Sequence, residues 1–154
     1  MNKQQSLFSK LGDKLSTSLN KEPKSSSNKS LTSRKKQGNK AEDLAFKFLN
    51  KKGLKLLEKN FSTKAGEVDL IMQDGETIVF IEVRYRKNAD FGGAAASVTP
   101  KKQLRVIKAA LAYQQKHAPQ SSMRFDVVAI EGDNEELNWI QSAFDGSVYS
   151  SYAP

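Results

Sequence analysis

Side chains that could bind a metal ion or a phosphate group occur together in the stretch GEVDLIMQDGETIVFIEVRYR. Glu82 lies inside the apolar run TIVFIEV, and Arg84 and Arg86 follow it at alternate positions. A strand this apolar is expected to be buried, and burying an unpaired carboxylate costs on the order of several kcal/mol. Glu82 therefore needs a cation or hydrogen-bond donors, and two further acids, Glu67 and Asp69, precede it on the chain.

The dipeptide Asp74-Gly75 predicts a two-residue hairpin turn between these acids. With that turn, Glu67 lies opposite Glu82, and Asp69 is a diagonal neighbour of Glu82 at a Cβ distance of roughly 7 Å. Because alternate side chains of a strand share a face, the charged residues gather at one end of one face. The other face is apolar throughout and consists of Val68, Leu70, Met72, Val79, Ile81, Val83 and Tyr85.

Two carboxylates at this separation can share a divalent cation whose oxygen ligands lie about 2.1 Å away. The chain has no cysteine and one histidine, His117, which excludes disulfides, thiolate nucleophiles and ordinary Cys/His zinc sites. A metal site would thus use oxygen ligands, which favours Mg²⁺, Mn²⁺ or Ca²⁺. The alternative is that Arg84 and Arg86 form ion pairs with Glu67 and Glu82 on a solvated face, and the charge pattern leaves both interpretations open.

The elements that must position these residues follow from periodicity and stop signals. Their order predicts a single α/β domain with a mixed central sheet flanked by a helix on each side. The second expected helix, which ends at His117, has a predicted apolar stripe of Leu104, Ile107, Ala110 and Leu111. We expect a helix from about residue 38 that ends at Gly53, strands at 54–61 (irregular near Asn60), 67–72 and 77–86, a helix from Thr99 or Pro100 to His117, and strands at 123–132 and 136–144.

The positive charge lies in the leader of the chain. Residues 1–40 hold 10 Lys/Arg and 2 Asp/Glu, whereas residues 41–154 hold 15 of each, so the net charge of +8 belongs to the first segment. We expect a largely disordered basic leader at 1–37, because residues 20–40 have too few apolar groups to offset the entropy of ordering. Leucines at every fourth position predict a short amphipathic helix at 5–19.

The leader could bind polyanions without sequence preference, contact a protein partner, or simply be solvated. We expect the α/β domain to span 38–145 and a flexible tail to follow at 146–154. No stretch approaches the ~20 apolar residues of a membrane span, so we expect a cytoplasmic protein.

Six short motifs, in chain order, resemble the YraN-like family of small bacterial proteins: GNKAE, GEVDL, IEVRYR, SVTPKKQ, RFDVV and a closing AF. The resemblance spans about residues 38–145. It implies a restriction-endonuclease-like PD-(D/E)xK core related to Holliday junction resolvases, a DNA endonuclease-like phosphodiesterase activity that depends on Mg²⁺ or Mn²⁺, and a homodimer.

The resemblance also implies roles for single residues. The metal ligands would be Asp69 and Glu82, supported by Glu67 or Glu42, and the catalytic residues would be Asp69, Glu82, Arg84 and Lys102. The lysine or glutamine that the family pattern has at the start of the later helix falls at Lys102 or Gln103. From the charge pattern, we predict nucleic-acid contacts at the basic side chains Arg86, Lys101, Lys102 and Arg105, for which a solvated face is the alternative.

The chain departs from the family pattern at two positions. Arg84 occupies the position of the motif lysine, and Val68 that of the motif proline. Arginine can stabilise phosphate charge, but it stays protonated and cannot act as a general base. Water activation would therefore depend on the metal, with help from Lys102 if the helix delivers it.

This departure leaves open whether the chain is an enzyme. The alternative is a catalytically inactive nuclease-fold module that binds nucleic acid or a protein partner, and a third reading is an assembly protein that touches no nucleic acid. A second acid in a strand, Asp126, is expected to pair with Arg124 and to be structural.

Overall fold

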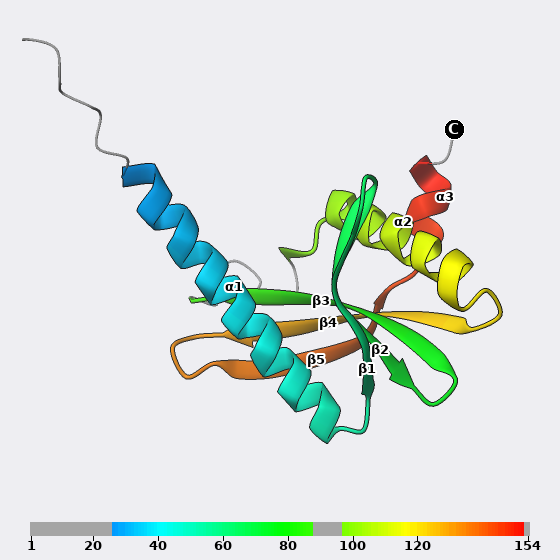
Figure 1. The fold of residues 1–154 in the computed structure, drawn as a ribbon, viewed down its shortest axis with the longest axis horizontal. Helices are drawn as coiled ribbons and strands as arrows, with labels where there is room; N and C mark the ends of the chain where they lie inside the picture. Colours follow the sequence, from blue (N-terminus) through cyan, green and yellow to red (C-terminus); the bar gives the residue numbers. More distant parts are fainter. Residues whose placement is uncertain (1–25, 88–96, 153–154) are drawn as a thin grey trace, which may run out of the picture. The chain divides into compact units, whose positions relative to one another are not determined.

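The computed structural model describes residues 26–87 and 97–152, in which five strands form one mixed sheet in the order β1-β2-β3-β4-β5 (Figure 1). Strands β3 and β4 are parallel and the other neighbours are antiparallel. This confirms the α/β class with a mixed sheet. The elements are α1 (Ser26–Lys51), β1 (Lys55–Thr63), β2 (Gly66–Asp74), β3 (Thr77–Arg86), α2 (Pro100–His117), β4 (Ser122–Glu131), β5 (Glu136–Phe144) and α3 (Ser147–Tyr152).

The chain divides into two compact units, residues 1–33 and 34–154, and the second contains the sheet. Helix α1 begins at Ser26, so the structure makes residues 26–40 helical where we expected disorder. Many of these residues are lysine, arginine and glutamine, which are good helix formers, so the helix propagates toward the N-terminus from its packed end. The predicted amphipathic helix at 5–19 lies outside the described residues.

The two helices cover opposite faces of the sheet, as predicted. On the α1 face, Ala41, Ala45 and Leu49 of α1 pack against strand residues that include Leu70 and Ile81. On the α2 face, the helix packs against the other side of the same strands. The buried residues of that face are Val68, Ile71, Ile78, Phe80, Val106, Ile107, Ala109, Ala110, Tyr113 and Phe125.

The apolar stripe of α2 differs in part from our prediction. Ile107 and Ala110 are buried as expected, but Leu104 is half-buried and Leu111 is 36% exposed. The buried face is instead completed by Val106, Ala109 and Tyr113. These positions follow the i, i+3, i+4, i+7 spacing of one helix face, and two alanines in its middle let the helix lie close to the sheet.

The β2–β3 turn is displaced from the predicted position. Asp74 pairs with Thr77, so the two turn residues are Gly75 and Glu76 rather than Asp74 and Gly75. Gly75 has a φ of 59°, as the first position of a II′-type turn requires, and glycine adopts it without strain. Asp74 remains in the strand, where its Oδ2 accepts a hydrogen bond from Arg124 Nη1 at 2.9 Å.

The irregularity predicted near Asn60 is present, because Asn60 has a φ of 53° and lies between the pairs Lys59↔Leu70 and Phe61↔Val68. One prediction about the faces is wrong: Val68 packs on the α2 face, although we placed it with Leu70, which packs on the α1 face.

The C-terminal segment also differs from our prediction of a flexible tail at 146–154, because residues 147–152 form the short helix α3. Asp145 Oδ1 accepts a hydrogen bond from the backbone N–H of Ser147 at 2.8 Å and so caps this helix. Within the described parts of the chain, no helix has the length and apolar character needed to cross a membrane.

Candidate functional site

Strands β2 and β3 separate where their two acids lie. The last pair in register is Leu70↔Ile81. One residue further, Asp69 Oδ2 accepts a hydrogen bond from the backbone N–H of Val83 at 2.7 Å. The Asp69 carboxylate thus accepts a β3 backbone hydrogen bond that, in a regular sheet, a backbone carbonyl of the neighbouring strand would accept. Our register placed Glu67 opposite Glu82, whereas the observed register brings Asp69 there instead.

Glu82 is almost fully buried and incompletely hydrogen-bonded. It is 1% exposed, and its Oε2 has no hydrogen-bond partner within the described residues. Its Oε1 lies 3.3 Å from Lys102 Nζ and 3.6 Å from Arg84 Nη1. Burial first, and then the charge of Asp69, raise the pKa of Glu82 to about 8, against the opposing effect of both cations. At neutral pH the side chain therefore favours the neutral acid.

Helix α2 brings an ammonium group to this acid. Thr99 caps the helix through a 3.4 Å hydrogen bond from the Lys102 backbone N–H to its hydroxyl, and Pro100 begins the first turn. Lys102 Nζ lies 3.2 Å from Glu67 Oε1, so it bridges Glu67 and Glu82. Burial alone would lower the pKa of Lys102, but the surrounding carboxylates outweigh it and the pKa is raised.

Asp69 and Glu42 form the side of the site nearest α1. Burial raises the pKa of Asp69, opposed by its hydrogen bond from Val83 and by the charge of Lys102. Burial is also the main cause that raises the pKa of Glu42, and the charge of Asp69 adds to it, while a hydrogen bond to the Asn60 side chain opposes it. The acid predicted on the first helix therefore lies within electrostatic reach of Asp69.

The ion pairs of the arginines agree with the alternative we considered for Arg84, which contacts Glu82, but not for Glu67. Arg84 contacts Glu82 and donates from Nε to Ser97 Oγ at 2.9 Å. Glu67 is paired with Lys102 and, at 3.7 Å, with Arg105 Nη2, rather than with a strand arginine. Arg86 is exposed at the end of β3.

The predicted residues thus separate into two groups. The site brings together Glu42, Glu67, Asp69, Glu82, Arg84, Lys102 and Arg105, which we call the acid cluster. Arg86 and Lys101 are exposed at its margin, and no ion pair joins them to the acid cluster in the described part of the chain. Lys102 is the residue whose placement depends most on tertiary structure.

Sequence reasoning missed one residue that supports the acid cluster. Gly66 begins β2, and a Cβ at this position would lie 1.9 Å from the backbone oxygen of Arg105. Only glycine lets β2 approach α2 this closely, and the contact is one turn after Lys102. A glycine at the start of a predicted strand is itself a sign of close backbone approach.

The donor set limits which metal ions could bind. Within the described residues no three His, Cys, Asp or Glu side chains are grouped to hold a metal ion. The adjacent carboxylates are Asp69 and Glu82, and the second has an oxygen without a partner. Mg²⁺ is often held by one or two carboxylates together with water and phosphate oxygens. The acid cluster therefore fits a cation shared with a phosphate group better than one enclosed by protein ligands.

The other buried acid is the structural residue that we predicted. Asp126 is paired with Arg124 at 2.9 Å and also accepts hydrogen bonds from Trp139 Nε1 and the Ser142 backbone N–H, each at 3.0 Å. Its carboxylate joins β4 to β5 where their register shifts.

The sequence is similar to a family of bacterial proteins. The model of the family described as "Uncharacterised protein family UPF0102" matches residues 41–130. A UPF0102 protein of Herminiimonas arsenicoxydans is 50% identical over 114 residues, which cover 74% of this chain and 90% of that protein. UPF0102 proteins of Nitrosomonas eutropha and Vibrio campbellii are 51% and 49% identical, over 75% and 73% of this chain and 98% and 95% of theirs.

Proposed function

We propose that this chain, which belongs to the uncharacterised protein family UPF0102, is a cytoplasmic nucleic-acid-binding protein that hydrolyses DNA phosphodiesters with a divalent cation. The observation that supports the proposal is the convergence of two adjacent acids, Asp69 and Glu82, with Lys102 and Arg84 where β2 and β3 separate. Titratable groups with raised pKa values that converge in this way are typical of functional sites. The proposal includes a restriction-endonuclease-like core for the mixed sheet.

Asp69 and Glu82 would hold Mg²⁺ or Mn²⁺ together with a phosphate oxygen. Such a cation supplies Lewis-acid chemistry and lowers the pKa of water. Glu67 and Glu42 would support this pair, Glu67 by fixing Lys102 and Glu42 through its electrostatic effect on Asp69. Because burial favours the neutral form of Glu82, a divalent cation would convert it to the carboxylate.

Lys102 and Arg84 would contact the phosphate rather than remove a proton. The pKa of Lys102 is raised, so it is a cation at working pH. Arginine is protonated at all working pH and its planar fork fits phosphate oxygens. Both side chains can therefore stabilise charge that develops on the phosphate. Arg86, Lys101 and Arg105 would contact the nucleic-acid backbone.

The test is cleavage of supercoiled plasmid and of four-way-junction DNA by the full chain, with Mg²⁺ or Mn²⁺ and with EDTA. We expect metal-dependent cleavage that Glu82→Gln and Asp69→Asn each reduce at least a hundredfold, because the cation loses a ligand. The matched control is Glu76→Gln, which removes the same charge from an exposed turn residue. Equal cleavage by Glu82→Gln and wild type would show that the acid cluster is not the active site.

A second candidate is a nuclease-fold module without catalysis, because Arg84 occupies the lysine position of the motif and is held by Ser97. Under this alternative the wild type binds DNA without cleaving it, and Arg84→Lys gains metal-dependent cleavage. Cleavage by the wild type would exclude this candidate. Light scattering of the same samples tests the homodimer, for which we expect twice the mass of one chain.

A further inference from the structure

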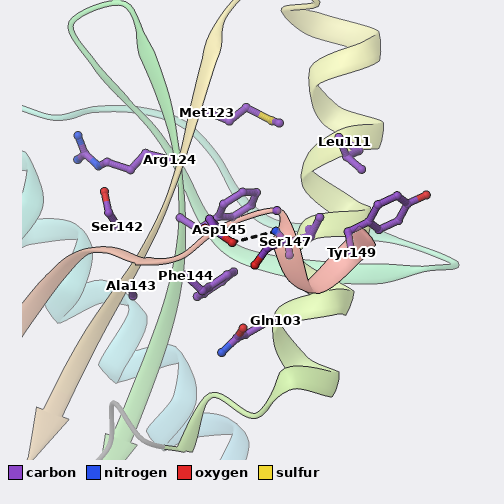
Figure 2. Close-up of a pocket in the computed structure, with 13 residues that line it drawn as sticks. Gln103, Leu111, Met123, Arg124, Ser142, Ala143, Phe144, Asp145, Ser147 and Tyr149 are labelled. Carbon is purple, nitrogen blue, oxygen red and sulfur yellow. Dashed lines mark hydrogen bonds between the residues drawn. The ribbon is translucent and has the colours of Figure 1, made fainter. Parts of the chain in front are cut away.

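A pocket of about 900 Å³ lies beside the acid cluster, between α2, β4 and the segment that joins β5 to α3 (Figure 2). Helix α2 contributes Gln103, Ile107 and Leu111, and α3 contributes Tyr149. Ligand pockets in proteins commonly have this size and a mostly apolar lining with a few polar groups. The pocket is not part of the acid cluster and shares no residue with it.

The lining of the pocket suits an uncharged planar group. Phe125 is buried and stacks on both Phe80 and Phe144, with ring centroids 5.7 and 5.2 Å apart, so the exposed apolar surface of the pocket comes mainly from other side chains. Leu111 and Tyr149 are 36% and 38% exposed, and both line the pocket. Apolar and aromatic surfaces of this kind favour contact with the face of an aromatic ring.

The charged groups at the pocket already have partners inside the protein. Arg124 pairs with Asp126 and Asp74, and Asp145 caps α3 through Ser147, as the dashed line in Figure 2 shows. The pocket therefore offers little net charge to a ligand. The amide of Gln103, held by a 3.0 Å hydrogen bond from Nε2 to the Val98 carbonyl, provides a polar group at the end nearest the acid cluster.

The pocket and Lys102 of the acid cluster lie along the same helix, α2, whereas Glu42 joins the cluster from α1. Lys102 belongs to the acid cluster and the next residue, Gln103, lines the pocket. The acid cluster draws on β2, β3 and α2, and the pocket is lined by β4, the end of β5 and α2. Two cations that could contact a phosphate, Lys102 and Arg84, thus adjoin a pocket with little net charge.

We propose that this pocket receives an unpaired nucleobase of DNA whose backbone lies at the acid cluster, an inference that rests on the proposed function. The base stacks against the aromatic and aliphatic lining, which does not distinguish one base from another, because every base has an aromatic face. The preferred substrate is therefore DNA with an extrahelical or single-stranded base, which is already unpaired and costs less to place in a pocket.

The test compares the affinity of the full chain for two fluorescein-labelled DNA duplexes, one fully paired and one with a single unpaired base, by anisotropy in EDTA. Stacking in the pocket predicts about tenfold tighter binding of the second duplex. Leu111→Glu and, as a second variant, Tyr149→Ala are expected to abolish this preference. The matched control is Leu57→Glu, the same change at another exposed leucine (42%), which lies on β1.

The ratio of the two affinities separates this inference from the proposed function. A preference kept by Leu57→Glu and lost in both pocket variants supports the nucleobase pocket. Salt-dependent binding without any preference in the wild type overturns the pocket and leaves the proposed function in place. Absence of binding to either duplex overturns the pocket, and the cleavage test, which supplies the divalent cation, decides the proposed function separately.

Discussion

Two aspartates, Asp126 on β4 and Asp69 on β2, lie at similar places in the sheet, but Asp126 is fully buried, Asp69 is half-buried, and their surroundings differ. Each lies beside an edge strand that contains a residue with left-handed backbone, Ser142 (φ 50°) or Asn60 (φ 53°). Each also accepts a hydrogen bond from a backbone N–H of a neighbouring strand. Around Asp126, the donors of Arg124, Trp139 and Ser142 serve both carboxylate oxygens.

Around Asp69 the network is incomplete. The neighbouring acid, Glu82, is buried to the same degree as Asp126, yet one of its oxygens has no partner in the described residues. Its pKa is raised to about 8, since burial and a second carboxylate outweigh the nearby cations. A buried acid with complete hydrogen bonding stabilises a sheet, whereas one with an unpaired oxygen indicates a site for a ligand.

The largest effect is expected at the complete network. Asp126→Ala would leave an indole N–H and a backbone N–H without their acceptor and Arg124 with Asp74 alone, which we expect to cost about 4 kcal/mol of unfolding free energy. Urea denaturation measures this loss, and Asp126→Asn, which keeps one acceptor, should lose less. A loss below 1 kcal/mol for the alanine variant would show that the hydrogen bonds of Asp126 do not stabilise the fold as proposed.

Glu82→Gln is expected to raise the free energy of unfolding at high pH, in contrast to the loss expected for Asp126→Ala. The pKa of Glu82 rises from its ordinary value of 4.5 to about 8 on folding, so its stabilisation of the fold is present below pH 4.5 and is lost as pH rises through 8. Glutamine does not titrate, and the variant should therefore be more stable than wild type at pH 9 by on the order of 3 kcal/mol. At pH 4.5 the two should unfold alike. Denaturation in EDTA at both pH values checks this, and parallel pH profiles would contradict it.

Gly66→Ala is expected to damage the acid cluster through the backbone. The added Cβ would meet the Arg105 carbonyl oxygen at 1.9 Å, so α2 must move, at a cost of about 2 kcal/mol. The matched control is Gly38→Ala in α1, where nothing lies within 4 Å and the helix should gain about 1 kcal/mol. Equal effects of the two substitutions on unfolding free energy would show that the close approach at Gly66 is not required.

The smallest effect is expected at the cap of α2. Thr99→Ala removes the hydroxyl that accepts from the Lys102 backbone N–H, which we expect to cost about 1 kcal/mol. Thr99→Ser keeps an acceptor and should restore most of the loss in a thermal unfolding measurement. If the serine variant is no more stable than the alanine variant, the hydroxyl does not cap the helix.

Elements with clear local signals were predicted well. The strands at 77–86 and 136–144 and the helix that ends at His117 agree with the structure, because alternation, a proline at the first turn and a stop signal define them locally. The proximity of Asp69 and Glu82 was also predicted, although the register was displaced by two residues. Because a shift of two residues leaves every side chain on the same face, the misplaced β2–β3 turn still predicted which charged side chains lie together.

Features that depend on tertiary packing could not be predicted. The position of Lys102 between two acids follows from how α2 docks, which in turn depends on the absence of a side chain at Gly66. Val68 and Leu70 pack on opposite faces although they are two residues apart on one strand, which the alternation of strand side chains does not predict. The N-terminal extension of α1 was missed since a polar sequence gives no packing signal.

The left-handed residues on β1 and β5 also affect how one molecule meets another. These two strands are the edges of the sheet, and straight edges present unpaired backbone groups that recruit strands from other chains. Asn60 and Ser142 interrupt that edge geometry, and the pairings of β1 with β2 and of β4 with β5 both shift register. These distortions of the two edge strands therefore discourage edge-to-edge polymerisation and amyloid-like aggregation.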